Sequence, residues 1–198
     1  MRVAIFDYGA GNLHSLAKAL SRAGTDVSIE TDGDKALASD ALILPGVGAF
    51  SLAAESLSPH IASIKTALSS GLPCLGICLG MQLLFDSSEE GNGEGVGFFS
   101  GHVRRLVGPR VPQIGWNDLE QRTGELFETS GLTTAYFANS FVCDPQDSLA
   151  IRAWATHEGD RFVASVESGN VVGVQFHPEK SSDRGIAFID AFLRRISA

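Results

Sequence analysis

One cysteine lies between two glycines, in a segment that changes character at that point. Cys78 has Gly76 two residues before it and Gly80 two residues after it, and the apolar residues that precede it are typical of a strand. A strand that turns sharply into a helix presents a nucleophile above a sheet, and glycines let such a turn close without a Cβ clash. The helix start would stabilise negative charge on the sulfur. Cys78 is therefore a candidate nucleophile, and the amide of Leu79 is a candidate oxyanion donor.

A histidine and a glutamate follow a second apolar run, at residues 171–174. His177 suits proton transfer near neutral pH, and Glu179 is placed to fix its tautomer and orientation. Pro178 restricts His177 to an extended conformation, and side chains two positions apart on an extended chain point to the same side. We expect Cys78, His177 and Glu179 to form a catalytic triad.

A Gly-Val-Gly run at residues 46–48 follows a third apolar run at residues 41–44. Its amides can turn toward a neighbouring site, and the amide of Val47 is a candidate second oxyanion donor. Each of these signals has a structural alternative: a buried cysteine, a loop histidine beside a surface glutamate, or an ordinary tight loop. Their combination favours catalysis.

The other cysteines and histidines lack a comparable context. We interpret the following as structural or surface residues: Cys74, Cys143, His14, His60, His102 and His157. Gly9 and Gly11 begin a partial dinucleotide-binding pattern, with Glu30 and Asp32 about twenty residues further on. The third glycine of that pattern is missing, because His14 occupies its position. We therefore predict no nucleotide site.

The composition excludes several classes of protein. A formal net charge of −8 argues against nucleic-acid binding, which relies on basic patches. No apolar run reaches the roughly 20 residues that span a bilayer, and the strand-like start at residues 2–6 leaves no room for a secretion signal. Three cysteines make no disulfide framework. We expect one cytoplasmic domain over residues 1–198, with no cofactor or metal, no membrane and no nucleic acid.

Strand-like and helix-like segments alternate in the first part of the chain. Apolar strand-like runs lie at residues 2–7, 26–30, 41–44 and 73–77, and helical spacing of apolar residues follows the first run and precedes the last. Such alternation predicts an α/β fold with a mostly parallel sheet flanked by helices. The loops after parallel strands converge on one crevice, so the three chemical signals are expected to meet there.

The pattern changes after about residue 86. A loop is expected at residues 87–97, followed by short strands at 103–107, 134–142, 151–156, 162–166 and 171–176. Polar connectors between the last three strands indicate hairpins, so an antiparallel β extension is predicted in the C-terminal half. A final helix carries Ile186, Ile189, Leu193 and Ile196.

These residues closely resemble a known family, the class I (triad) glutamine amidotransferases. The Gly-x-Cys-x-Gly-x-Gln box of that family matches residues 76–82, and its His-Pro-Glu box matches residues 177–179. Within the class, the chain resembles the glutaminase subunits of imidazole glycerol phosphate synthase in histidine biosynthesis. The resemblance covers roughly residues 1–195. Four stretches carry it: residues 7–12, 44–50, 115–117 and 175–180.

The resemblance implies a flavodoxin-like fold, a γ-glutamyl thioester on Cys78 and an oxyanion hole made by the amides of Val47 and Leu79. It implies that L-glutamine is held by Gly46, Gly48, Gln82, Ser140 and Phe141. The family usually has His-Ser-Tyr where this chain has Asn-Ser-Phe at residues 139–141. We expect activity to survive this difference, because glutamine contacts there are mostly to backbone atoms in relatives.

The resemblance also implies a partner, the (β/α)8-barrel cyclase subunit of imidazole glycerol phosphate synthase. The cyclase would use the ammonia to form imidazole glycerol phosphate and an aminoimidazole ribotide. The expected docking residues are Gly9, Asn12, Trp116, Asn117 and Lys180.

Two other interpretations stay open. One is another cysteine hydrolase, such as a γ-glutamyl peptidase or a glutaminase that serves a different synthase; residues 45–48 and 115–117 argue against it by resemblance only. The other is a regulatory module without activity. Such a module would usually have lost its nucleophile or its base, whereas Cys78, His177 and Glu179 are all present.

Overall fold

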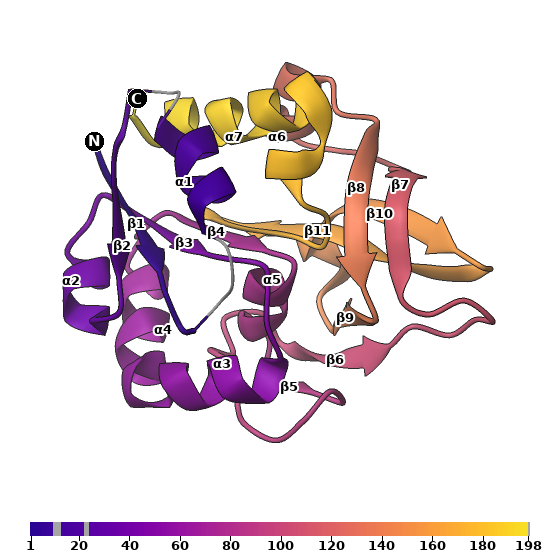
Figure 1. Cartoon of the computed structure of the whole chain (residues 1–198), viewed down its shortest axis with the longest axis horizontal. Coiled ribbons are helices and arrows are strands. Elements are labelled where there is room, and N and C mark those ends of the chain that lie inside the picture. Colours follow the sequence, from indigo (N-terminus) through magenta and orange to yellow (C-terminus); the bar gives the residue numbers. More distant parts are fainter. Residues whose placement is uncertain (10–12, 22–23, 198) are drawn as a thin grey trace.

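The computed structural model describes residues 1–9, 13–21 and 24–197. Within these residues the centre is a seven-stranded sheet with the order β10-β11-β12-β4-β3-β1-β2 (Figure 1). The strands from β12 to β2 run parallel, and β11 and β10 continue the sheet in antiparallel fashion. The bounds are β1 (Arg2–Phe6), β2 (Asp26–Glu30), β3 (Ala41–Leu44), β4 (Cys74–Ile77), β10 (Ile151–His157), β11 (Asp160–Ser168) and β12 (Val171–Val174).

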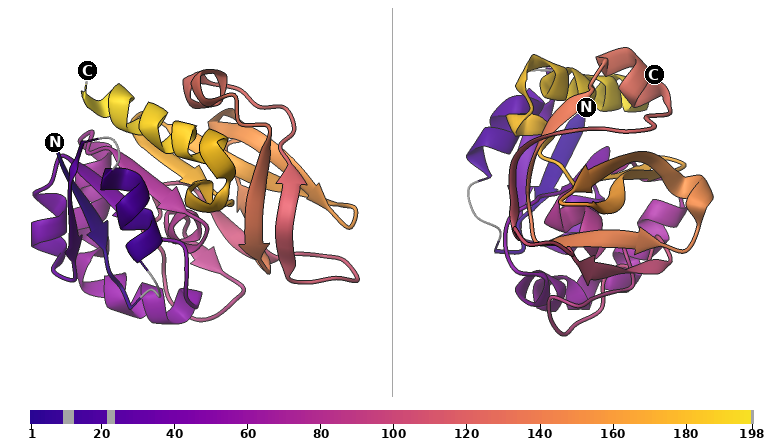
Figure 2. Two further views of the ribbon diagram at one scale, coloured as in Figure 1. Left: turned by 45° about the horizontal axis from the view of Figure 1, so that its top comes forward. Right: turned by 90° about the vertical axis from the view of Figure 1, so that its right-hand side faces the viewer.

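Helices cover both faces of this sheet, as Figures 1 and 2 show. One face carries α1 (His14–Ser21), α6 (Glu125–Ser130) and α7 (Ser182–Ser197). The other face carries α2 (Gly33–Leu37), α3 (Phe50–Leu57), α4 (Ile61–Ser69) and α5 (Leu79–Leu83). The predicted α/β fold with a mostly parallel, helix-flanked sheet is confirmed.

Two hydrophobic cores, one on each face of the central sheet, explain why the parallel strands could be predicted from the sequence. In β1, Val3 and Ile5 enter the core beneath α1 and α7, whereas Ala4 and Phe6 enter the core beneath α3 and α4. All four are at most 1 % exposed. A strand that is buried on both faces must be apolar at every position, and this is the continuous pattern seen at residues 3–6 and 41–44.

The predicted antiparallel extension is also present. β10, β11 and β12 form consecutive antiparallel pairs. Two small sheets lie beside them: β5 (Ser87–Ser88), β6 (Gly101–Arg105) and β9 (Phe141–Pro145) form one, and β7 (Gln113–Asp118) and β8 (Thr134–Asn139) form the other.

Some element predictions were wrong in detail. The run at residues 134–142 is not one strand, because the chain changes partner at Ser140: β8 pairs with β7, and β9 pairs with β6. The loop at 87–97 contains the short strand β5, and the strand expected at 103–107 begins two residues earlier as β6. Asp32, named above in the partial dinucleotide-binding pattern, caps α2: its Oδ1 accepts the N–H of Asp34 at 3.0 Å.

Four elements had no sequence signal strong enough to predict them: α2, α3, α6 and β7. They are short or carry mixed polar and apolar residues. Two positions named above, Gly11 and Asn12, lie outside the described residues. In the part of the chain that is described, no helix combines the length and the apolar character needed to cross a membrane.

Candidate active site

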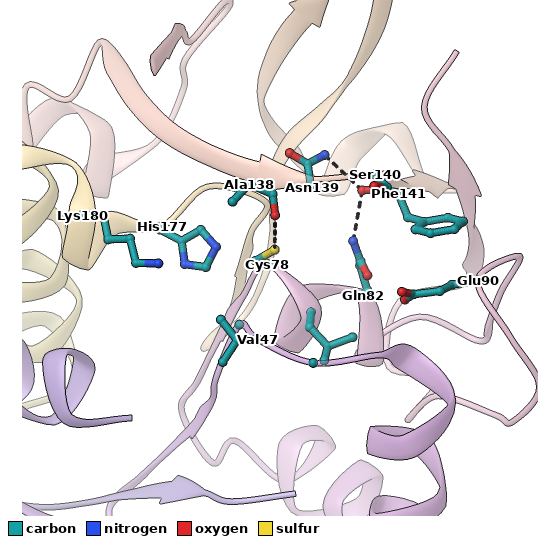
Figure 3. Close-up of a pocket in the computed structure, with 13 residues that line it drawn as sticks. Val47, Cys78, Gln82, Glu90, Ala138, Asn139, Ser140, Phe141, His177 and Lys180 are labelled. Carbon is teal, nitrogen blue, oxygen red and sulfur yellow. Dashed lines mark hydrogen bonds between the residues drawn. The ribbon is translucent and has the colours of Figure 1, made fainter. Parts of the chain in front are cut away.

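Three loops meet at one edge of the sheet. Residues 45–48 follow β3, Cys78 follows β4, and His177 lies three residues after β12. These three strands are adjacent and parallel, so their carboxyl ends share that edge. Figure 3 shows Cys78 between His177 on one side and Gln82 on the other.

Cys78 occupies a strained turn between β4 and α5. Its φ of 49° and ψ of −104° fall in a region that residues other than glycine rarely adopt. Its N–H donates to Val174 O at 2.7 Å, and its carbonyl accepts the N–H of Gln82 at 3.1 Å. Such strain costs roughly 1–3 kcal/mol and is concentrated at functional sites. The N–H of Leu79, the first residue of α5, has no acceptor within its own helix.

The glycines beside Cys78 let the backbone approach itself closely. A Cβ on Gly76 would lie 2.7 Å from Gly80 O, and a Cβ on Gly80 would collide with Leu44 O. Both clashes involve backbone atoms, so no side-chain rotation can relieve them. The prediction that glycine is needed at these positions to avoid a Cβ clash is therefore confirmed.

His177 is held rigidly. Its ring Nδ1 lies 2.8 Å from Glu179 Oε1, its N–H donates to Tyr136 O at 2.8 Å, and its carbonyl accepts from Ser181 Oγ at 2.6 Å. His177 is extended, at φ −100° and ψ 94°, as Pro178 predicts. The expectation of an extended chain through Glu179 was wrong. Residues Pro178–Lys180 form a 3-10 turn, and this turn folds the carboxylate back onto the ring.

His177 and Cys78 are in contact with the Gly-Val-Gly run at residues 46–48, the glycine loop. A Cβ on Gly46 would lie 3.1 Å from both Cys78 Cβ and His177 Cε1, so glycine is needed where the three segments meet. Burial lowers the pKa of His177, but its hydrogen bonds to Cys78 and Glu179 outweigh burial and raise the pKa to about 9. The ring therefore holds a proton at neutral pH.

A cavity of about 270 Å³ opens over Cys78. Its walls come from the loop after β3, the start of α5, the ends of β8 and β9, and the 3-10 turn. The lining residues are Gly46, Val47, Gly48, Cys78, Leu79, Gln82, Glu90, Ala138, Asn139, Ser140, Phe141, His177 and Lys180. All of the predicted oxyanion and substrate residues are therefore brought to this cavity. Glu179 lies behind His177 instead.

Sequence reasoning missed two residues here. Glu90 lines the cavity from the segment read as a plain loop, and its Oε2 accepts the N–H of Phe50 at 3.1 Å. Gln175 is fully buried, and its Nε2 lies 3.4 Å from Cys78 Sγ. Both carried a signal that could have found them. Glu90 is acidic in a segment close to the cysteine box, and Gln175 precedes His177 by two residues.

Asn139, which departs from the histidine that the sequence resemblance led us to expect, is bonded within the protein. Its Nδ2 donates to Phe141 O at 3.1 Å, and Gln82 Nε2 donates to the same carbonyl at 3.0 Å (Figure 3). The asparagine thus supports the backbone of the cavity wall.

A smaller cavity of about 110 Å³ lies on the other side of His177. It is shared by the glycine loop, α1 and the 3-10 turn, and both Glu179 and Lys180 line it. Oε2 of Glu179 is buried and has no hydrogen-bond partner among residues 1–9, 13–21 and 24–197. The two cavities share four lining residues: Gly46, Val47, His177 and Lys180.

The residues predicted to dock a partner differ in exposure. Trp116 on β7 is 56 % exposed, and its ring packs edge-on against Tyr136. Lys180 is exposed beside both cavities. Asn117 is half-buried and donates to Thr156 O at 2.9 Å. Gly9 is exposed, with a φ of +82°.

Cys74 and Cys143 lie in the interior, and burial raises the pKa of both thiols. Among the described residues, no group of three or more His, Cys, Asp or Glu side chains is arranged to hold a metal ion.

The fold has close counterparts. A solved structure described as a glutamine amidotransferase superimposes with a TM-score of 0.77 at 20 % identity, covering 99 % of both chains. The family model for class-I glutamine amidotransferase matches residues 4–196. The chain therefore belongs to the class-I glutamine amidotransferase family.

Curated relatives narrow this assignment. The imidazole glycerol phosphate synthase subunit HisH of Trichodesmium erythraeum is 42 % identical over 98 % of this chain and 94 % of that protein. The HisH subunit of Moorella thermoacetica is 43 % identical over 96 % of this chain and 93 % of that protein. Within the class, the chain groups with these HisH subunits.

Proposed function

We propose that this chain is the glutaminase subunit of an imidazole glycerol phosphate synthase. It hydrolyses L-glutamine to glutamate in the cytoplasm and passes the ammonia to a (β/α)8-barrel cyclase subunit. The observation that carries the proposal is the arrangement of Cys78, His177 and Glu179 beside a cavity that has Glu90 on the side opposite His177 (Figure 3). The HisH names of the full-length relatives supply the choice of synthase.

The first half of the reaction forms a thioester. The Cys78 thiolate attacks Cδ of the glutamine side chain, and the carbonyl electron pair moves to the oxygen. The amides of Val47 and Leu79 are the proposed donors to this oxyanion. His177, which holds a proton at neutral pH, gives that proton to the nitrogen as the C–N bond breaks. Ammonia leaves, and a γ-glutamyl group remains on the sulfur.

The second half releases glutamate. The neutral His177 takes a proton from water, whose oxygen attacks the thioester carbon. The C–S bond then breaks, and its electron pair returns to Cys78 as a thiolate opposite a protonated His177. Glu179 keeps Nδ1 engaged through both halves, so that the other ring nitrogen serves the reacting atoms. The sum is glutamine plus water giving glutamate plus ammonia.

The cavity suits a free amino acid. Its volume of about 270 Å³ is below the roughly 300–1,000 Å³ that is usual for drug-sized ligands. Glu90 is the acidic lining residue and is placed to pair with the α-ammonium group. Ser140 and Phe141 supply backbone groups on the adjacent wall, and Gln82 lies between this wall and the sulfur.

The partner is expected to bind over the small cavity. Lys180 lies at its rim, and β8 packs against the 3-10 turn that carries Lys180. Trp116 and Ile114 are exposed on the neighbouring strand β7, at 56 % and 69 %. Exposed aromatic and aliphatic side chains beside a charged rim are typical of a docking surface. A partner seated there would cover the small cavity, which His177 also lines.

One reconstitution tests the proposal. Glutamate release and imidazole glycerol phosphate formation are measured with and without the cyclase encoded by the same organism. Cys78→Ala should abolish synthesis from glutamine but leave synthesis from added ammonium salt. Loss of both activities would mean that Cys78 is structural. Glutamate release without any gain in synthesis would point to a different synthase or to a free hydrolase.

A further inference from the structure

A line of side-chain amides connects the glutamine cavity to the reacting sulfur. Gln82 Nε2 donates to Phe141 O at 3.0 Å and to Gln175 Oε1 at 3.2 Å. Gln175 Nε2 in turn lies 3.4 Å from Cys78 Sγ, within the reach of a hydrogen bond to sulfur. Gln82 is 4 % exposed and Gln175 is fully buried, so water does not compete for these bonds.

The direction of this line is fixed at its far end. The oxygen and nitrogen of an amide are assigned from the bonds that they make. Phe141 O is a backbone carbonyl and can only accept, so Gln82 must turn its NH2 group toward it. The second hydrogen of that group then faces Gln175 Oε1. The NH2 group of Gln175 is therefore left facing the sulfur, because the opposite orientation would set two NH2 groups against each other.

A donor in this position distinguishes the two forms of the cysteine. A thiol sulfur is a weak acceptor, whereas a thiolate accepts a charge-assisted hydrogen bond of about twice the usual strength. We infer that Gln175 is a further catalytic residue: its Nε2–H stabilises the Cys78 thiolate, and Gln82 holds the amide in the donating orientation. The inference rests on the proposed glutaminase function.

Other groups also act on this sulfur and must be held constant in a test. His177, the buried Tyr8 and the buried Cys143 interact with it electrostatically. Glu90 and Lys180 line the same cavity, and Glu179 acts through His177. Comparing single variants at Gln175 leaves all of these groups in place.

The pH profile of Cys78 alkylation by iodoacetamide reports the thiolate directly and needs neither glutamine nor the cyclase. Cys74 and Cys143 are buried, and Cys78→Ala supplies the blank. In Gln175→Met the pH of half-maximal alkylation should rise by about one to two units, the range for losing a hydrogen bond to a charged group. Gln175→Glu, which is nearly isosteric but carries a negative charge, should shift the profile at least as far.

Gln113→Met is the matched control, because Gln113 is also buried, at 4 % exposed, and lies outside the cavity. It should keep the wild-type profile. If the Gln175 variants fail to fold, Gln82→Met tests the same line, because it frees the Gln175 amide to rotate and should shift the profile in the same direction by less. A wild-type profile in folded Gln175→Met and Gln175→Glu overturns the inference.

Turnover in the reconstituted complex gives the second measurement. Gln175 does not line the cavity, so Gln175→Met should lower kcat for glutamine about tenfold or more and leave KM unchanged. A rise in KM with unchanged kcat would contradict the assignment. If the wild-type chain released no glutamate with its cyclase, the proposed function would fail, yet the alkylation comparison would still decide the role of Gln175.

Discussion

Glu179 uses one carboxylate oxygen on His177 and, among the described residues, leaves the other without a partner. Oε1 lies 2.8 Å from Nδ1 of the ring, whereas the buried Oε2 has no hydrogen-bond partner in the described part of the chain. The side chain of Glu179 is 8 % exposed, and that of His177 is 2 % exposed. At such low exposure, solvent screens the attraction between this carboxylate and the ring of His177 only weakly. Glu179 is accordingly one of the groups that raise the pKa of His177.

The first prediction concerns pH. The pKa of His177 is raised from its ordinary 6.5 to about 9, so the protonated ring predominates below pH 9 and is lost as pH rises through that value. Since the leaving nitrogen needs this proton, kcat/KM for glutamine should fall above about pH 9. Glu179→Gln removes one of the groups that raise the pKa of His177, so in this variant kcat/KM should begin to fall at a lower pH. The exposed Glu128→Gln on α6 should keep the wild-type curve. Coincident curves for wild type and Glu179→Gln would refute this role.

The second prediction concerns the triad as a unit. Cys78→Ala and His177→Ala should each reduce kcat/KM for glutamine by nearly the same factor as the double variant, because both act in one transition state. Glu179→Gln should cost less than His177→Ala, since it orients the ring and does not transfer the proton. Steady-state glutamate release in the complex measures all four proteins. Losses that multiply in the double variant would show that the two side chains act independently.

The third prediction concerns substrate recognition by Glu90. Glu90→Gln should raise KM for glutamine roughly tenfold to a hundredfold, the range for a hydrogen bond to a charged group, with little change in kcat. Glu89→Gln is the matched control, because Glu89 accepts the N–H of Arg105 and does not line the cavity. Equal KM values for the two variants would remove Glu90 from the binding site. Since Glu90 also caps α3 at Phe50 N, circular dichroism should accompany the kinetics.

The fourth prediction concerns the glycine loop. Gly48 has a φ of +132°, and a Cβ there would lie 3.3 Å from Leu79 Cδ2. Gly48→Ala should cost roughly 1–3 kcal/mol of stability and should lower glutaminase activity by up to about a hundredfold by displacing the Val47 amide. Gly71→Ala is the control, with a φ of +102° and open space around the added Cβ, far from the site. Equal activities in the two variants would mean that the loop supplies no oxyanion donor. Alkylation of Cys78 should persist in both.

Local sequence patterns were enough to predict several parts of this protein. The strands β1, β3, β4 and β12 are buried on both faces, so each must be a continuous apolar run. The turn at Cys78 needs glycine at positions 76 and 80, because backbone atoms approach each other closely there. Neighbouring parallel strands bring their carboxyl ends together, so the order of motifs along the chain was enough to predict that Cys78, His177 and the glycine loop converge.

Other features depend on contacts between segments that are far apart in the sequence. The run at residues 134–142 reads as one strand because strand propensity does not reveal that Ser140 separates two pairing partners. Glu90 and Gln175 lie 12 and 97 positions from Cys78 in sequence. Their local context marks them as worth attention, but only the fold shows that Glu90 lines the cavity and that Gln175 faces the sulfur. The carboxylate of Glu179 reaches the ring through a 3-10 turn and not along an extended chain. Long-range contacts of this kind depend on how separate elements pack together, and packing is a property of the whole fold.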